Sequence, residues 1–280
     1  MTRHVTLTGL TLYPVKSCAG IPVERADALA RGLRHDRRWM LVDEHGAFLT
    51  QRRHPRLARI HPELTGASLR LSWDGPGPAP IELLLGETGP SQGRRVRVWR
   101  DELDAHDLGE DVAAWCTEVL QMSCRLVRMP EGAGRVVRAS ALALFSGHDI
   151  DPHVSFADGY PYLLLSEASL ARINEDLSDP VDMRRFRPNL VIDAPGMEAF
   201  AEDEWSMLRR ADGLTFCITS ACSRCSVITV DPDRGVLAGP QPTKALARYR
   251  LRDQEVYVGQ NMVVVGSGEV RVGDVFEVVA

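Results

Sequence analysis

The sequence predicts a strand-dominated α+β protein with barrel-like sheets, and three observations support this. Short apolar runs with alternating or β-branched residues recur along the whole chain, separated by Gly- and Pro-rich turns. Helical periodicity is confined to short segments near 111–122, 166–177 and 243–250. The 280 residues are enough for two modest domains. We therefore expect a barrel-like α+β architecture with two or three helices.

Composition and charge exclude several classes of protein. A formal net charge of -5 argues against a general nucleic-acid binder. No stretch approaches the roughly 20 apolar residues that span a bilayer, and no signal-like apolar run follows the basic N-terminal residues. Six cysteines without regular spacing fit free thiols in a reducing compartment. We expect a cytoplasmic protein that binds neither nucleic acid nor a membrane.

The first part of the chain is a succession of predicted strands. A strand over 5–15 runs into a turn bracketed by Pro14 and Gly20, which carries Lys16 and Ser17. Such a turn can offer an ammonium, a hydroxyl and backbone N–H groups to an anion, although a solvated surface lysine is the simpler interpretation. Further elements are a strand at 39–43 with a hairpin to 47–50, strands at 67–71, 81–85, 95–99 and 124–128, and a helix at 111–122 whose Cys116, like Cys124, is a core thiol.

A basic region stands out inside this acidic chain. It comprises Arg34, Arg37, Arg38, Arg52, Arg53 and Arg56. A solvated face is one interpretation. An anion pocket is the other, because guanidinium groups match phosphate oxygens.

The second part begins after 130–160, a Gly- and Ala-rich segment that we interpret as a linker or a mobile loop over a site. A buried strand at 162–165 precedes a helix that Ser166 caps. In a strand over 186–193, Arg187 and Asn189 would point the same way. The strand at 256–266 contains Gly259-Gln260-Asn261, which indicates a bulge or a close ligand approach. A closing strand with a turn at 272–274 spans 268–279.

The most informative stretch is 217–233. It predicts a strand, a small-residue turn that holds Cys222, Arg224 and Cys225, a second strand over 226–230 and a turn. A neighbouring guanidinium favours the thiolate of Cys225, the form that ligates soft metals or attacks electrophiles. A buried cysteine acting as a small hydrophobe is the alternative.

Together these segments resemble the MOSC superfamily, and the resemblance covers nearly the whole chain. Residues 3–125 resemble its N-terminal β-barrel module, and 130–278 resemble the MOSC domain, a β-barrel-like domain packed on that module. The chain is most similar to the amidoxime-reducing components and their bacterial relatives, which reduce N-hydroxylated compounds. The motifs are Tyr13-Pro14-Val15-Lys16-Ser17-Cys18, Asp36-Arg37-Arg38-Trp39, Ser166-Glu167-Ala168-Ser169-Leu170, Phe186-Arg187-Pro188-Asn189, Ala201-Glu202-Asp203-Glu204-Trp205, Cys222-Ser223-Arg224-Cys225 and Thr229-Val230-Asp231-Pro232-Asp233.

The resemblance implies a molybdenum cofactor, with Cys225 as the catalytic residue and metal ligand and Cys222 as its neighbour. The animal proteins carry an aromatic residue where this chain has Asn261, and small hydroxylic residues where it has Gly159 and Tyr160, so we expect backbone contacts from the latter two. The cofactor-binding residues that the resemblance implies are Lys16, Ser17, Arg37, Gly159, Tyr160, Arg187, Asn189, Ser223, Arg224 and Asn261.

The implied activity is reduction of N–OH to N–H on a small N-hydroxylated substrate. Some bacterial relatives hold an iron–sulfur cluster, but this chain has no C-x4-C-x2-C run, so we expect no cluster and a separate electron-donor protein or reductase. Glu202 or Asp203 could be tested as a proton donor. Two alternatives stay open, namely a cofactor carrier or storage protein without turnover, and a thiol–disulfide or zinc role for Cys222 and Cys225. The zinc role lacks a second ligand pair.

Overall fold

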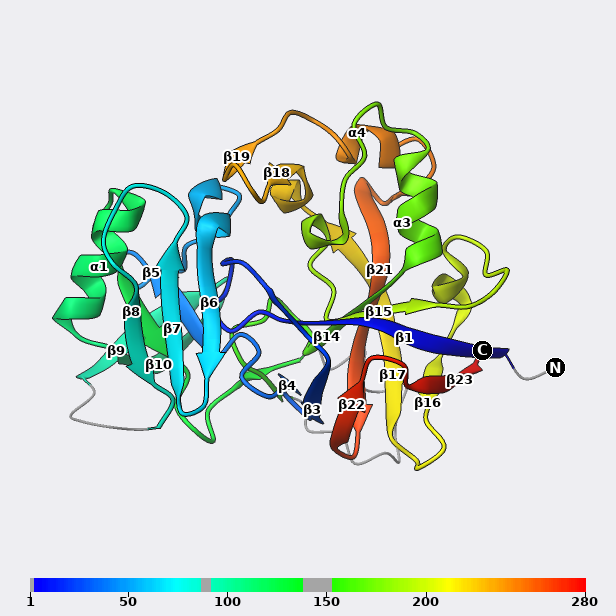
Figure 1. Ribbon diagram of the computed structural model, residues 1–280, viewed down its shortest axis with the longest axis horizontal. Helices are drawn as coiled ribbons and strands as arrows, with labels where there is room; N and C mark the ends of the chain where they lie inside the picture. Colours follow the sequence, from blue (N-terminus) through cyan, green and yellow to red (C-terminus); the bar gives the residue numbers. More distant parts are fainter. Residues whose placement is uncertain (1–2, 87–91, 138–152) are drawn as a thin grey trace.

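The computed structural model describes residues 3–86, 92–137 and 153–280, and its strands form two halves that lie side by side (Figure 1). The larger sheet closes into a barrel, because β14 pairs with both β15 and β21. Around the barrel the order is β14 (Tyr162–Ser166), β15 (Leu190–Asp193), β1 (Arg3–Leu12), β23 (Val275–Val279), β16 (Met207–Arg209), β17 (Thr215–Arg224) and β21 (Glu255–Val265), with β2 (Ile21–Val23) and β20 (Leu251–Arg252) attached.

The barrel is filled by the apolar residues that alternate along its strands. Leu7 and Leu10 of β1 point into the same core as Phe216 and Phe276, whose ring centroids are 5.9 Å apart. Each such side chain contributes about 1.5–3 kcal/mol when it is fully buried. The first strand of the chain therefore completes a barrel built mainly from its second half.

The other half contains two smaller sheets and a helix. The strands of one are β5 (Trp39–Val42), β11 (Arg125–Arg128), β10 (Asp101–Asp107) and β9 (Gln92–Val98), and those of the other are β6 (Ile60–Thr65), β7 (Ser68–Trp73) and β8 (Ile81–Leu84). Helix α1 (Glu110–Leu120) buries Trp115 and Cys116 in a core shared with Trp39 and Cys124. The predicted helix and both core thiols are confirmed.

Short elements connect and cover the two halves. The short strands are β3 (Arg25–Leu29), β4 (Gly32–Leu33) and β22 (Gly268–Arg271), the pair β12 (Arg135–Val136) and β13 (His153–Val154), and the pair β18 (Val230–Asp231) and β19 (Val236–Leu237). The helices are α3 (Glu167–Asn174) and α4 (Thr243–Leu246), with the 3-10 turns η1 (Pro55–Arg59), η3 (Met183–Arg185), η4 (Ala201–Glu204) and η5 (Ser226–Thr229).

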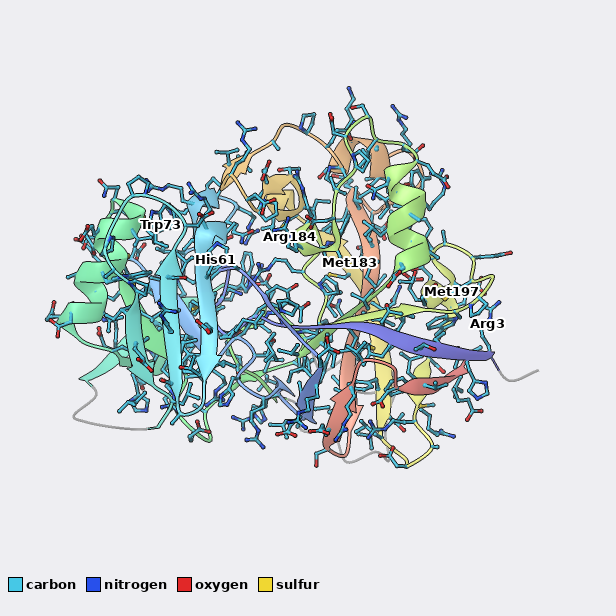
Figure 2. The ribbon with its side chains drawn as sticks, in the orientation of Figure 1. Arg3, His61, Trp73, Met183, Arg184 and Met197 are labelled. Atoms are coloured by element: carbon cyan, nitrogen blue, oxygen red, sulfur yellow. The ribbon has the colours of Figure 1, made fainter. Side chains whose placement is uncertain are left out.

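The β18–β19 hairpin packs across the seam between the halves. It contacts η1, and a Cβ added at Gly235 in its turn would lie 2.9 Å from Cδ of Arg59. In Figure 2, His61 and Trp73 are labelled on one half and Arg184 on the other. The strand-dominated α+β fold and the barrel are thus confirmed. The domain boundaries at 125 and 130 stay a prediction.

The cap of α3 is built as the sequence predicts. The Ser166 hydroxyl accepts a hydrogen bond from the Ser169 amide at 3.1 Å. Both hydroxyls also donate to the fully buried carboxylate of Glu202, at 3.0 and 2.7 Å. Glu202 is therefore a structural anchor for α3, since a buried carboxylate needs such donors.

The prediction for the cysteine stretch is wrong in two places. Cys222 lies within β17, which stays paired with β21 through Arg224, rather than on a turn. The expected strand over 226–230 is instead the turn η5, followed by the two-residue β18. Ile228 of η5 is buried against α3 and α4, so tertiary packing overrides the β propensity of this run.

Other predicted boundaries shift. The first strand ends at Leu12, the strand over 186–193 begins only at Leu190, and the α-helix expected at 243–250 ends at Leu246. Arg187 has a φ of 56°, so the chain is not extended there. The predicted turn over 272–274 is confirmed between β22 and β23. Of the segment 130–160, residues 138–152 lie outside the described part of the chain.

The backbone at Gly259 of β21 predicts an effect on stability. Gly259 has a φ of 79°, and a Cβ there would lie 2.6 Å from the Leu164 carbonyl oxygen. We expect Gly259→Ala to lower the free energy of unfolding by about 1–3 kcal/mol in urea denaturation. Gly66→Ala is the control, because Gly66 has a φ of 59° and open space around it. Equal losses for the two variants would contradict the steric part of this account.

Candidate active site

The structure gathers all eleven predicted site residues around one cavity of about 150 Å³. They come from the turn after β1, from the segments before β5, β14 and β15, and from the end of β17 and the middle of β21. Residues from both halves thus share the cavity.

Three of the lining residues have left-handed backbone conformations. The φ angles are 66° at Ser17, 47° at Arg37 and 56° at Arg187. Non-glycine residues rarely adopt this conformation, and it costs on the order of 1–3 kcal/mol at each position. Such strain persists only where the surroundings enforce it, and it clusters at functional sites.

The cavity is lined by an excess of positive charge. Asp158 is the one carboxylate among its described lining residues, whereas five side chains are cationic: Lys16, Arg37, Arg52, Arg187 and Arg224. Arg187 donates to the Cys18 carbonyl at 2.7 Å, and no carboxylate of the described residues pairs with it. An uncompensated cation at a half-buried position favours an anionic ligand.

Arg37 is held by a buried network below the cavity. It forms an ion pair with Asp36, which is 2% exposed, and donates to the Asn189 side-chain oxygen at 2.9 Å. The Asn189 amide in turn donates to Asp36 at 3.0 Å and to the Thr11 carbonyl at 3.1 Å. Arg187 and Asn189 do reach one cavity, but through a left-handed residue rather than an extended strand.

Lys16 is buried and paired. Its ammonium donates to the Phe156 carbonyl at 2.8 Å and forms an ion pair with Asp158. Burial lowers the pKa of Lys16, and the attraction of Asp158 offsets this only in part. Burial on its own raises the pKa of Asp158. The Lys16 charge, the hydrogen bonds from Lys16 and Trp99 and the Arg52 charge together outweigh burial and bring that pKa to about 2.

Two thiols reach the cavity. Cys225 is exposed directly after β17, and Cys222 is half-buried with its sulfur 3.2 Å from Nη1 of Arg224. The other Nη of Arg224 donates to the Phe186 carbonyl at 2.5 Å. The remaining four cysteines are buried, and burial raises the pKa of Cys18 to about 12 and that of Cys217 to about 11. Cys222 and Cys225 are therefore the thiols available for chemistry.

Irregular pairing between β17 and β21 shapes this wall. The register shifts twice, between Ile218 and Ser220 and between Ala221 and Ser223. Asn261 of β21 donates to the Ser220 hydroxyl at 3.2 Å beside the first shift. Bulges re-aim side chains next to active sites, and the bulge predicted at Gly259-Gln260-Asn261 is confirmed.

The sequence reasoning missed several lining residues, of which Asp158 and Arg52 carry charge. Arg52 belongs to the basic region of the sequence, so the local excess of arginine indicates it. Of that region only Arg37 and Arg52 line the cavity, whereas Arg34 pairs with Asp27 at the surface. Asp158 had no signal, because its partner Lys16 is 142 positions away in the chain.

The two carboxylates considered as proton donors are absent from the cavity lining. Glu202 is fully buried under Ser166 and Ser169. Asp203 pairs with Arg250 at 2.7 Å and accepts from the Gln260 amide at 2.6 Å. Both residues serve the packing around α3 and β21.

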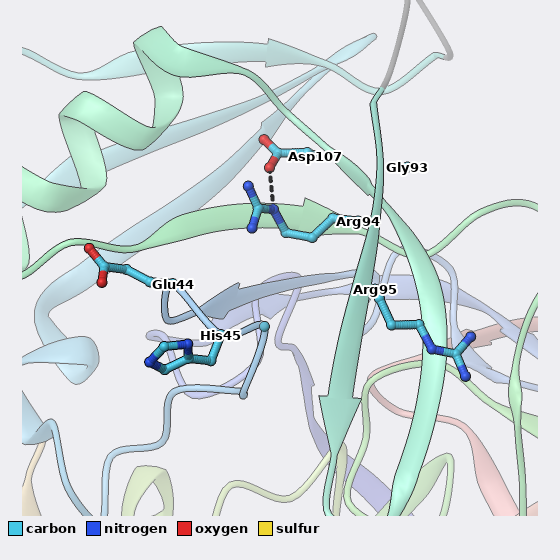
Figure 3. A pocket seen from close by; sticks show the side chains of 7 residues that line it. Glu44, His45, Gly93, Arg94, Arg95 and Asp107 are labelled. Carbon is cyan, nitrogen blue, oxygen red and sulfur yellow. Dashed lines mark hydrogen bonds and ion pairs between the residues drawn. The ribbon is translucent and has the colours of Figure 1, made fainter.

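A second hollow, of about 310 Å³, lies on the N-terminal half (Figure 3). Arg94 points to Asp107 there, at 2.6 Å, and Arg125 pairs with the same carboxylate at 2.5 Å. These charges compensate one another, unlike those around Arg187. The cavity with the thiols is therefore the stronger candidate.

Comparison with known proteins agrees with this geometry. The model of the MOSC N-terminal beta barrel domain matches residues 4–123, and that of the MOSC domain matches residues 151–277. The chain belongs to the MOSC family.

Three curated relatives of this MOSC chain have closely related names. Mitochondrial amidoxime-reducing component 1 is 37% identical in Homo sapiens and 36% identical in Mus musculus, each over 96% of this chain and 81% of the relative. Mitochondrial amidoxime reducing component 2 of Homo sapiens is 34% identical over 96% of this chain and 82% of its own. Within the described ranges, no helix is both long and apolar enough to span a bilayer.

The buried Asp36–Arg37 pair predicts a large effect on stability. Asp36→Asn leaves Arg37 buried without its counter-charge, and we expect a loss of about 3–5 kcal/mol in urea denaturation. Asp27→Asn is the matched control, because its 2.7 Å pair with Arg34 is exposed and is worth less than about 1 kcal/mol. A similar loss in the two variants would contradict the importance of burial.

The Asp158 pKa predicts a pH dependence. Its folded-state pKa of about 2 lies below the usual 3.8, so ionised Asp158 stabilises the fold above about pH 4. This contribution is lost as the pH falls toward 2. Because the side chain is 68% exposed, the effect stays below about 1 kcal/mol. Urea denaturation of wild type and Asp158→Asn at pH 6 and pH 3 measures this contribution. The difference in free energy of unfolding between the two proteins should shrink at pH 3, and a difference that grows on acidification would refute the prediction.

Proposed function

We propose that this protein is a molybdenum-cofactor-dependent reductase that converts N–OH to N–H in small N-hydroxylated compounds. The observation that carries the proposal is that one cavity combines an exposed thiol with five cationic side chains and, among its described lining residues, a single carboxylate. The names of the curated relatives, as amidoxime-reducing components, support this substrate class.

The cationic lining fits the phosphate-bearing pterin of that cofactor. Arg37 and Arg187 present guanidinium groups that can bind phosphate oxygens in pairs, and Lys16 adds a point charge. Arg187 has no carboxylate partner among the described residues, so the phosphate would supply its counter-charge. Ser17, Ser223, Asn189 and Asn261 offer polar groups to the ring edges, and the backbone at 159–160 offers further ones.

The thiol fits the metal. Molybdenum is a soft, redox-active metal for which a thiolate is a suitable ligand, and Cys225 is exposed at the cavity. When bound, the cofactor supplies the two-electron chemistry, in which N–OH with two electrons and two protons gives N–H and water. A separate donor protein or reductase would deliver the electrons, and we place this reaction in the cytoplasm.

Proton delivery belongs to water rather than to a carboxylic acid of the described lining. Asp158 has a pKa of about 2 and is ionised at neutral pH, so it holds no proton to donate. Its role is that of counter-ion to Lys16. Because Cys225 is exposed, water reaches the reacting end of the cavity.

Two cysteine variants test the function. We expect Cys225→Ser to lose molybdenum and to lower turnover of benzamidoxime with an artificial reductant by about 100-fold or more, because ligand loss exceeds the roughly 10–100-fold cost of outer-shell changes. Cys222→Ser should retain most of both, since its thiol is a neighbour and not the ligand. Metal analysis, pterin fluorescence after oxidation and product assay are the measurements.

The other outcomes are equally informative. Total loss in Cys222→Ser would favour a dithiol site. Bound molybdenum and pterin without any turnover would favour a cofactor carrier or storage protein. Neither molybdenum nor pterin in the wild type, even after incubation with free cofactor, would refute the enzyme and the carrier alike.

A further inference from the structure

Tyr13 contacts two of the arginines that line the cavity. Its side chain is 3% exposed, and it is absent from the described lining of the cavity. The Cζ atom of Arg37 is 4.6 Å from the ring centroid, and that of Arg187 is 4.2 Å from the same centroid. Both distances are within the range of a cation–π contact, about 6 Å. One buried ring therefore contacts both guanidinium groups.

The ring itself is fixed at both ends. The Tyr13 hydroxyl donates to the Pro188 carbonyl at 3.2 Å, and its amide donates to the Asp36 carboxylate at 2.8 Å. Its carbonyl accepts from the Arg37 amide at 2.8 Å. Tyr13 thus contacts the Arg37 backbone, the Asp36 carboxylate that precedes it and the Pro188 carbonyl that follows Arg187, and it joins segments that are far apart in the chain.

This arrangement holds together two like charges that repel. The two Cζ atoms lie less than about 9 Å apart, and the charge of Arg37 lowers the pKa of Arg187 further, after burial. Arg37 has the Asp36 carboxylate as a partner, but Arg187 has only the Cys18 carbonyl and the Tyr13 ring among its described contacts. The electron-rich face of the ring contacts both guanidinium groups without accepting an in-plane N–H, so it uses none of the donors that an anion needs.

We propose that Tyr13 is a positioning residue that pre-organises Arg37 and Arg187 as one receptor for a phosphate group. The ligand class is a phosphorylated anion. The proposal rests on the proposed function for the identity of the physiological ligand, but the receptor itself is defined by the ring and the two guanidinium groups. Lys is not equivalent to Arg against such a ring, because an ammonium lacks the planar face of a guanidinium.

The test is the affinity of the full-length chain, prepared free of molybdenum and pterin, for inorganic pyrophosphate in isothermal titration calorimetry. We expect Tyr13→Leu to weaken binding about tenfold, and Tyr13→Phe, which keeps the ring, to restore affinity to within about twofold of wild type. Tyr249→Leu is the matched control, because Tyr249 also contacts an arginine, Arg172 at 4.8 Å, but outside the cavity. It should bind as wild type.

A second variant keeps the test decisive if Tyr13→Leu does not fold. Arg187→Lys keeps the charge but not the planar guanidinium, and we expect it to lose about tenfold in affinity. In wild type and Tyr13→Phe, but not in Tyr13→Leu, the Nε resonances of Arg37 and Arg187 should show ring-current shifts. This readout separates positioning from a general loss of stability.

Three results would overturn the proposal. They are wild-type affinity in a folded Tyr13→Leu protein, wild-type affinity in Arg187→Lys, and a loss in Tyr13→Phe as large as in Tyr13→Leu, which would assign the effect to the hydroxyl. None of these measurements involves molybdenum or turnover. A failed reductase assay with intact pyrophosphate results would therefore reject the proposed function and leave the receptor standing.

Discussion

The cavity depends on one buried carboxylate, that of Asp36. It accepts hydrogen bonds from the Tyr13 amide and the Asn189 side chain and forms an ion pair with Arg37. Those three partners come from the end of β1, the entry to β15 and the segment before β5. A charge buried to this degree is stable only with such partners. The same group therefore joins the two halves and fixes the direction of Arg37.

The excess of positive charge follows from this constraint. Asp36 compensates Arg37 and Asp158 compensates Lys16, whereas Arg187 stays without a described carboxylate partner and is held by the Tyr13 ring and a carbonyl. The left-handed conformations of Arg37 and Arg187 add strain to the electrostatic cost. Both costs are consistent with a cavity that binds an anion.

The thiol side of the cavity has a different origin. Here two register shifts between β17 and β21, rather than charge, set the positions of Cys222 and Asn261. A barrel wall is otherwise regular, so a bulge is a way to bring a strand residue to a site without breaking the barrel. The two sides meet because β1 is a strand of the same barrel as β17 and β21.

The sequence by itself determined the local features: the turn with Lys16, the cap at Ser166, the bulge near Asn261 and the motif with Cys225. Each depends on a few neighbouring residues, whose conformational preferences and spacing are visible in the chain. Only the tertiary structure decided that Asp158 neutralises Lys16, that one Tyr13 ring serves two arginines, and that Ser226 begins a 3-10 turn rather than a strand. These outcomes arise from contacts between residues far apart in sequence, where burial and pairing energies outweigh local propensity.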